Sequence, residues 1–285
     1  MSTFLKMSRP LPKFFKELFQ KYSFHPSRRL GQNFLIDKDV LDNIIKAAEL
    51  NKNDIVLEIG PGLGVLTKEL SKRAKRVIAV EKDKKLVKIL KEKLARLKNI
   101  EIIEGDILRL TTDDLQLTTG YKVVANLPYY ITSPVTRKFL EGKRPPRLMV
   151  LMVQKEVAER ICAKPPRMTL LSAAVQFYSH PEIVKIVKKE CFWPKPKVDS
   201  AIIRIANIRE YKCEFSRINP ELFFSVVRAG FTQPRKQLKN NLKRIFNKDT
   251  EGILKKSKIE GTRRAETLSI NDWIKICLTF KNTLK

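Results

Sequence analysis

The feature that most constrains the fold is an alternation of short apolar runs and amphipathic stretches, which continues from about residue 37 to residue 205. Between the runs, apolar residues recur at the spacing of one helix face, as at Leu86, Leu90 and Leu94. Short buried strands separated by amphipathic helices predict a mostly parallel sheet covered by helices on both faces, which is an α/β fold. The predicted strands are residues 55–59, 77–80, 100–103, 121–125, 148–153, 183–187 and 201–205, and further helices are expected at 155–163 and 169–180.

The pattern changes near residues 206–210, where we place a domain boundary. Beyond it we find only helical spacing and predict no strand. We therefore expect an α/β domain over residues 28–206 and a smaller all-helical domain over residues 207–285. Residues 1–27 form a basic lead, for which we favour a short helix or a docked arm over a mitochondrial targeting segment.

The charge of the chain is strongly positive, because its 58 lysines and arginines outnumber its 30 acidic residues and give a formal net charge of +28. Such an excess favours a polyanionic partner, either nucleic acid or an anionic membrane face. The sequence has no apolar run long enough to span a bilayer, and its four cysteines lack the paired spacing of a zinc or disulfide site. We therefore expect a protein of a reducing compartment without a membrane span or a bound metal.

A glycine-rich loop, Glu58-Ile59-Gly60-Pro61-Gly62-Leu63-Gly64, directly follows a predicted strand and precedes a helix. Glycines there allow a sharp turn and a close approach of the backbone to a ligand, although ordinary tight turns use them as well. The next strand ends at Glu81, whose carboxylate can accept both ribose hydroxyls of a nucleoside. The spacing is GxGxG and not the GxGxxG of dinucleotide enzymes, so a nucleoside without pyrophosphate is favoured over NAD.

Polar residues recur at the end of four predicted strands in this part of the chain. They are separated by 23, 25 and 20 residues, the length of one strand–helix step, and are Glu58, Glu81, Asp106 and Asn126. In open α/β sheets, ligands bind at the edge where the carboxyl ends of the strands meet. We therefore expect the four side chains to share one ligand site.

The last of these residues begins the segment Asn126-Leu127-Pro128-Tyr129. Its amide oxygen can accept from an exocyclic amine, its proline fixes the turn, and its tyrosine ring can stack on a flipped base. The alternative is a proline-bearing strand exit with a tyrosine in the core. The segment points to a nucleobase without excluding this structural role.

Together these stretches resemble the ribosomal RNA adenine N6,N6-dimethyltransferases, and the matching motifs follow the family's order from about residue 28 to residue 273. The resemblance implies S-adenosylmethionine as methyl donor and a class I (Rossmann-like) methyltransferase fold with a small helical C-terminal domain. One departure is Arg167-Met168-Thr169, where the family usually has a Tyr-Gly pair, and it affects the loop after Ala163. The matching stretches are residues 31–35, 58–67, 105–107, 126–129, 152–160, 192–200 and 264–266, together with Glu81.

The resemblance also implies roles for the residues of the expected site. Asn126 would line both donor and target, while Tyr129 and Phe192 would sandwich the target adenine; core packing is the alternative for Phe192. The Asn126 side-chain oxygen and the Leu127 backbone carbonyl would accept from the target amine, so that neither a strong base nor a metal is required. The donor would be contacted by Gln32, Asn33 and Leu35 at its methionine end, by Gly60 and Gly62 of the loop, by Glu81 at the ribose, and by Asp106 and Ile107 at its adenine.

A second candidate site lies in the helical domain, where residues 228–244 hold several basic residues and no acid. Lys236, Lys239 and Lys243 recur at intervals of three and four, which predicts that they share one helix face. We favour a phosphate-binding stripe over an ordinary solvated face. The residues that we assign to RNA binding are Arg235, Lys236, Lys239, Lys243 and Arg244.

The expected protein is thus an enzyme of ribosome biogenesis in the cytoplasm, which acts as a monomer on small-subunit ribosomal RNA. Alternatives are a large-subunit adenine methyltransferase of the antibiotic-resistance type and a non-catalytic assembly factor with a relic donor site. A nicotinamide-dependent dehydrogenase is a more distant fourth. The sequence leaves open which adenosines are modified, at which assembly stage, and in what order the two methyl groups are added.

Overall fold

The computed structural model describes residues 13–206, 208 and 218–283, and the chain forms two compact units. The first unit consists of the chain up to Ala158 together with residues 182–206, and the second contains residues 159–181 and the part after Ala206. The single boundary expected near residues 206–210 falls mostly outside the described residues. The observed division differs from it, because residues 159–181 group with the C-terminal helices.

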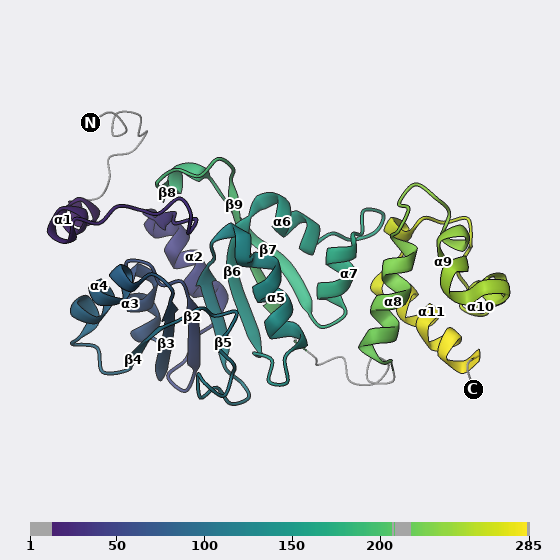
Figure 1. Ribbon diagram of the computed structural model, residues 1–285, viewed down its shortest axis with the longest axis horizontal. Coiled ribbons are helices and arrows are strands. Elements are labelled where there is room, and N and C mark those ends of the chain that lie inside the picture. Colours follow the sequence, from purple (N-terminus) through teal and green to yellow (C-terminus); the bar gives the residue numbers. More distant parts are fainter. Residues whose placement is uncertain (1–12, 207, 209–217, 284–285) are drawn as a thin grey trace. The chain divides into compact units, whose positions relative to one another are not determined.

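The first unit contains a seven-stranded sheet (Figure 1). Its strands are β2 (Ile55–Ile59), β3 (Arg76–Glu81), β4 (Ile100–Glu104), β5 (Lys122–Asn126), β6 (Leu148–Gln154), β7 (His180–Val187) and β9 (Ser200–Ala206). They are ordered β4-β3-β2-β5-β6-β9-β7. The first five strands in this order are parallel to one another, and β9 is antiparallel to β6. The expected mostly parallel sheet is confirmed, and all seven predicted strands are present with slightly shifted ends.

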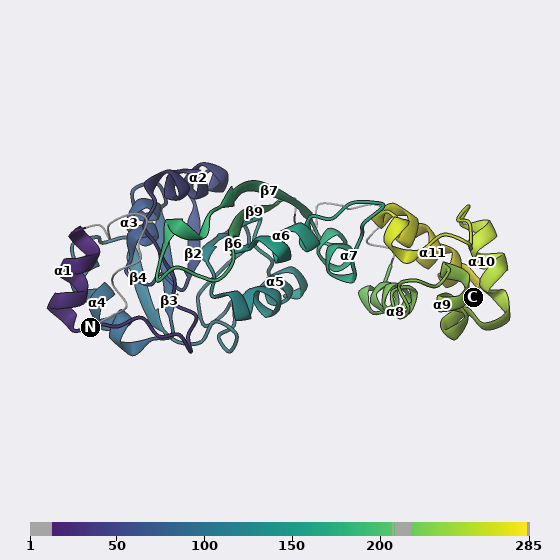
Figure 2. The ribbon, with the colours of Figure 1, turned by 90° about the horizontal axis from the view of Figure 1, so that it is seen from above.

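Helices cover both faces of this sheet, and Figure 2 shows α2 (Lys38–Ala48) and α5 (Thr132–Glu141) on opposite sides of the strands. The side chain of Asp37 begins α2 by accepting a hydrogen bond from the backbone N of Val40 at 3.1 Å. Asp83 caps α4 (Lys84–Leu94) in the same way, and the apolar face of each helix is buried. The other helices are α3 (Val65–Ser71), η1 (Tyr129–Ile131), η2 (Lys189–Cys191) and α6 (Lys155–Ile161), whose last residues belong to the second unit.

A small two-stranded sheet lies beside the large one. Strand β1 (Phe34–Leu35) pairs antiparallel with β8 (Phe192–Trp193), although more than 150 residues separate them. The lead contains a helix, α1 (Lys13–Tyr22), and its Phe19 ring lies 4.4 Å from the Trp193 ring between centroids. The expected docked helix is thus found within residues 13–27, while residues 1–12 lie outside the described residues.

The second unit is helical throughout its described residues after Ile218, as predicted. Its core includes the stacked rings of Phe177 and Phe223, whose centroids are 4.0 Å apart. The helix expected at 169–180 is shorter, because the chain enters β7 at His180. Met168 of the unusual loop is buried, and its backbone N donates to the carbonyl of Glu266 at 2.9 Å. The helices are α7 (Leu170–Gln176), α8 (Pro220–Gly230), α9 (Leu238–Phe246), η4 (Asn247–Asp249), α10 (Thr250–Lys256), η5 (Ala265–Thr267) and α11 (Ile270–Thr283).

Gly230 at the end of α8 permits close packing of α11, and we predict that Gly230→Ala is strongly destabilising. An added Cβ would lie 2.3 Å from Cη2 of Trp273, a residue with no exposed surface. Overpacking of this kind typically costs about 1–3 kcal/mol. Gly252→Ala is the matched control, because no atom lies within 4 Å of its added Cβ in α10. Urea unfolding should show a loss for the first variant and none for the second; equal free energies of unfolding would contradict this packing.

No helix among the described residues is long and apolar enough to cross a membrane.

Candidate active site

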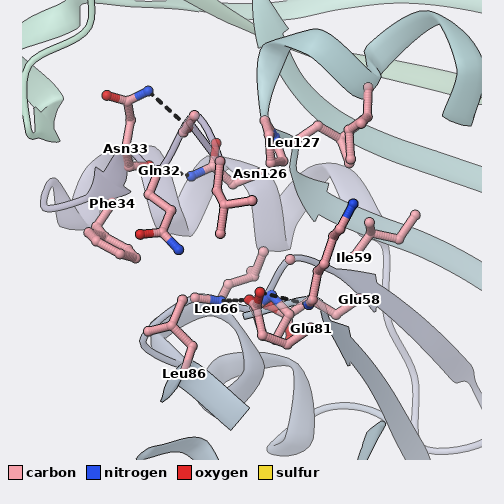
Figure 3. A pocket seen from close by; sticks show the side chains of 18 of the residues that line it. Gln32, Asn33, Phe34, Glu58, Ile59, Leu66, Glu81, Leu86, Asn126 and Leu127 are labelled. Carbon is pink, nitrogen blue, oxygen red and sulfur yellow. Dashed lines mark hydrogen bonds between the residues drawn. The ribbon is translucent and has the colours of Figure 1, made fainter. Parts of the chain in front are cut away.

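The carboxyl ends of β2, β3, β4 and β5 converge on one pocket of the first unit. The four polar residues expected at this edge all line it, which confirms that the spacing of the strand–helix steps brings them together. Figure 3 shows Gln32, Asn33 and Asn126 on one side of the pocket and Glu58 and Glu81 on the other. The pocket also contains every residue assigned to donor or target, namely Gln32, Asn33, Leu35, Gly60, Gly62, Glu81, Asp106, Ile107, Asn126, Leu127, Tyr129 and Phe192.

The glycine loop adopts a backbone that other residues rarely reach. Gly60, Gly62 and Gly64 have φ angles of +66°, +59° and +77°. A Cβ at Gly62 would lie 3.1 Å from the ring of Phe34, so the missing side chain lets β1 approach the loop closely. The loop thus forms one wall of the pocket, with its backbone exposed to a bound molecule.

Glu81 ends β3 and is 7% exposed. Its Oε2 accepts from the backbone N of Gly62 at 3.2 Å, and its Oε1 accepts from Lys82 and Asp83 at 2.8 and 2.9 Å. Burial raises the pKa of this carboxyl above its ordinary value, although the three backbone donors oppose the rise. The side chain is therefore held rigidly between the glycine loop and the start of α4.

Glu58 lies in the same wall and is 1% exposed. Its Oε2 has no hydrogen-bond partner. Burial raises the pKa of this carboxyl to about 8, and the charge of Glu81 adds to the rise. Burial disfavours the ionised form of this carboxyl. A positive charge beside it would restore that form, so the site favours a cationic ligand.

Asp106 lies at the mouth, two residues after β4. Its carboxylate accepts from Lys82 Nζ at 2.9 Å and from the backbone N of Leu108 at 3.0 Å. The hydrogen bond from Lys82 lowers the pKa of Asp106, so the group is ionised at neutral pH. An ionised carboxylate is a suitable acceptor for an amine at this place.

Asn126 ends β5 and lines the pocket. Its Nδ2 donates to the backbone carbonyl of Asn33 at 3.2 Å, as the dashed line in Figure 3 shows. The bond fixes the amide so that Oδ1 is the atom left to accept from a ligand. The next residue, Leu127, is buried, and its backbone N donates to the carbonyl of Met152 at 3.2 Å.

Two aromatic residues of the expected target site differ in their surroundings. Tyr129 is half-buried, and its hydroxyl lies 2.8 Å from Oγ of Ser200. Phe192 is only 2% exposed and packs in the hydrophobic core while also lining the pocket. Core packing and contact with a ligand are therefore compatible at Phe192.

Gln32 is tied to the protein at both ends of its amide. Its Nε2 donates to Asp83 at 2.9 Å, and its Oε1 accepts from the backbone N of Ser27 at 2.6 Å. These bonds connect the segment before β1 to the start of α4. The geometry suits a residue that holds the pocket wall in place.

Residues 24–282 match the family model described as ribosomal RNA adenine dimethylase. The chain belongs to this family. The resemblance seen in the motifs is thereby confirmed, and the dimethylase is an enzyme.

Curated relatives align with nearly the whole length of the dimethylase. The ribosomal RNA small subunit methyltransferase A of Dehalococcoides mccartyi is 45% identical over 93% of this chain and 92% of its own length. The protein of the same name from Clostridium botulinum is 42% identical, with 92% of this chain and 96% of the relative covered.

Solved structures confirm the class I methyltransferase fold. A dimethyladenosine transferase from Plasmodium falciparum gives a TM-score of 0.74 at 27% identity, covering 87% of this chain and 98% of that one. The 23S rRNA methyltransferase ErmE gives a TM-score of 0.71 at 28% identity, covering 87% and 99%.

The basic stripe of the dimethylase differs from its prediction in one respect. Lys236 does not share a helix face with Lys239 and Lys243, because α9 begins only at Leu238. The backbone N atoms of Leu238 and Lys239 donate to the carbonyls of Arg263 and Gly261, at 2.7 and 3.0 Å, and these bonds fix the helix start. The other basic residues remain candidates, with Arg235, Lys243 and Arg244 exposed and Lys239 half-buried.

Sequence reasoning missed two features of the pocket. It placed Glu58 at the sheet edge without a role, because complete burial of one carboxyl cannot be read from a strand pattern. It also left Tyr130 unassigned, although this residue and Leu108 line the pocket with exposed apolar surface. An aromatic residue directly after the Asn-Leu-Pro-Tyr segment was the available signal.

Proposed function

We propose that this dimethylase transfers methyl groups from S-adenosylmethionine to the N6 amine of adenosines in small-subunit ribosomal RNA, giving N6,N6-dimethyladenosine. The observation that carries the proposal is the fixed amide of Asn126, whose Oδ1 is left as an acceptor in the pocket wall. The match to the adenine dimethylase family supports this reaction. The names of the curated relatives support small-subunit RNA as the substrate.

The charges of the pocket fit the donor. S-adenosylmethionine is a nucleoside with a cationic sulfonium, and the pocket offers three carboxyl groups, those of Glu58, Glu81 and Asp106. Glu81 suits the ribose hydroxyls, Asp106 suits the donor's adenine amine with Ile107 beside it, and Gly60 and Gly62 provide the close backbone. Asn33 and Leu35 remain assigned to the methionine end, with Gln32 acting through the wall that it braces.

The target amine needs acceptors more than a base. Its lone pair is delocalised into the adenine ring, and acceptance by Asn126 Oδ1 and the Leu127 carbonyl would draw the amine toward a tetrahedral shape. Tyr129 and Phe192 would hold the ring, so that catalysis depends on positioning and electrostatics. The sulfonium supplies the leaving group, and we assign no metal to the reaction.

Methyl incorporation into separated ribosomal subunits tests this function. Unmethylated small and large subunits are each incubated with the protein and radiolabelled S-adenosylmethionine. We expect incorporation into the small subunit only. Incorporation into the large subunit instead would support the antibiotic-resistance type, and binding without incorporation into either would support a non-catalytic assembly factor.

We also propose that the basic stripe of the second unit binds RNA phosphates. Each phosphate contact steepens the dependence of affinity on salt by about 0.7–0.9 in a double-logarithmic plot. The triple variant Lys239→Gln, Lys243→Gln, Arg244→Gln should therefore flatten the slope by about 2–3. A matched variant on α4, Lys85→Gln, Lys88→Gln, Lys91→Gln, should retain the slope. Equal slopes for both triple variants would remove the stripe from the RNA interface.

The remaining expectations concern the setting of the reaction. We propose that the protein acts as a monomer, because one chain contains both the pocket and the basic stripe. We place its activity in the cytoplasm, where it would meet small-subunit RNA. Sedimentation of the protein with and without RNA tests the first of these proposals.

A further inference from the structure

Tyr130 is an exposed aromatic residue at the mouth of the pocket. Its relative exposure is 55%, the highest among the large hydrophobic residues in the described part of the chain. Six other described large hydrophobic residues are at least 36% exposed, and of these only Leu108 also lines the pocket. Single exposed apolar residues are ordinary on protein surfaces, but Tyr130 and Leu108 are exposed where they line a ligand pocket, so a bound molecule can reach them.

The backbone at Tyr130 is held in a short helix, and one side of its ring lies near another segment. The residue lies in η1, where the backbone N of Ile131 donates to the carbonyl of Pro128 at 3.1 Å. Gly31 lies beside the ring, where an added Cβ would be 3.6 Å from its Cδ1, an ordinary contact distance. The ring therefore has the segment before β1 on one side, while more than half of the residue's surface stays accessible.

The cationic side chain of Lys82 lies on the same side of the pocket as this ring. Lys82 is exposed, its ammonium forms an ion pair with Asp106 at 2.9 Å, and it lines the same pocket as Tyr130. Arg109 is exposed as well. An accessible aromatic ring in a pocket that also holds a cation is a combination that binds single-stranded nucleic acid, with the ring stacking on a base and the cation near the backbone.

We propose that Tyr130 forms a second nucleotide subsite, in which its ring stacks on the base adjacent to the target adenosine. The inference rests on the proposed function. A target base that leaves its stack to enter the pocket exposes the face of its neighbour. Tyr129 is anchored to Ser200 and committed to the inner pocket, whereas Tyr130, the next residue, faces the mouth where the neighbour must lie. Leu108 extends this apolar shelf.

Fluorescence of short RNAs tests the stacking without any methyl transfer. Pentanucleotides of adenosine carry 2-aminopurine immediately 5′ or 3′ of the central residue and are titrated with protein. Stacking should quench one of the two probes with the wild-type protein and with Tyr130→Phe, which keeps the ring. Tyr130→Ala should remove that quenching and weaken binding about five- to hundredfold. If Tyr130→Ala quenches each of the two probes as strongly as the wild-type protein does, the subsite is overturned.

Kinetics separate this inference from the proposed function. With unmethylated small subunits, Tyr130→Ala should raise KM for the subunit while leaving KM for S-adenosylmethionine unchanged. Val184→Ala on β7 is the matched control, because Val184 is also exposed and lies outside the pocket. Wild-type turnover with an unchanged KM in Tyr130→Ala would overturn the subsite and leave the function standing. Absence of wild-type turnover on any subunit would overturn both.

Discussion

Asn126→Ala should reduce kcat for methyl transfer at least about 10²- to 10³-fold while RNA affinity stays near that of the wild type. Removal of one preorganised group that stabilises a transition state typically costs this much. The side chain of Asn126 touches the RNA only through the target amine in this account, so phosphate contacts retain the complex. Single-turnover methylation and filter binding of RNA measure the two quantities separately.

Asn126→Asp provides the matched comparison. Its carboxylate keeps an acceptor oxygen but cannot donate to the carbonyl of Asn33, which orients the native amide at 3.2 Å. We therefore expect a rate between those of the wild type and the alanine variant. Parallel losses of RNA affinity and rate in both variants would contradict the assignment of Asn126 to the reacting amine.

The second large effect concerns the stability of the protein without ligand as pH rises. Glu58 has an ordinary pKa of 4.5 when unfolded and a pKa of about 8 in the folded pocket, chiefly because it is buried. Between these values the folded protein holds one proton more than the unfolded chain. The free energy of unfolding therefore falls as pH rises from about 4.5 to 8, by up to about 5 kcal/mol from this one group.

Glu58→Gln isolates this contribution, because glutamine has nearly the same shape and no proton to lose. The stability gap between variant and wild type should widen in favour of the variant up to about pH 8 and then stay constant. Urea unfolding across this pH range measures the gap. A gap independent of pH would show that Glu58 titrates at an ordinary pKa.

Donor binding should act on the same carboxyl. A cationic ligand beside Glu58 favours its ionised form, so binding of S-adenosylmethionine near pH 7 should release a proton. Calorimetry in buffers of different ionisation enthalpy detects this release, and Glu58→Gln should abolish it.

The sequence predicted the pocket well because its signal was periodic. Strand–helix steps of nearly constant length place Glu81, Asp106 and Asn126 at one sheet edge whatever the details of the intervening helices. Strands β2, β3, β5, β6 and β9 are buried on both faces, which leaves a strong continuous apolar pattern.

Features set by distant contacts could not be predicted in this way. Strands β1 and β8 have two residues each, too few for any pattern, and their pairing depends on the folded sheet. The start of α9 is fixed by carbonyls of Gly261 and Arg263, so the spacing of Lys236 was misleading. The raised pKa of Glu58 likewise arises only once neighbouring elements have excluded water from it.

The most direct test of the central claim is the identity of the modified nucleoside. Unmethylated small subunits are incubated with the protein and S-adenosylmethionine. The RNA is then digested to nucleosides, which are separated and identified by mass spectrometry. We predict accumulation of N6,N6-dimethyladenosine, which Asn126→Ala fails to produce. Methylation of a ring carbon or of the ribose, or dimethyladenosine formed equally well by Asn126→Ala, would contradict the account.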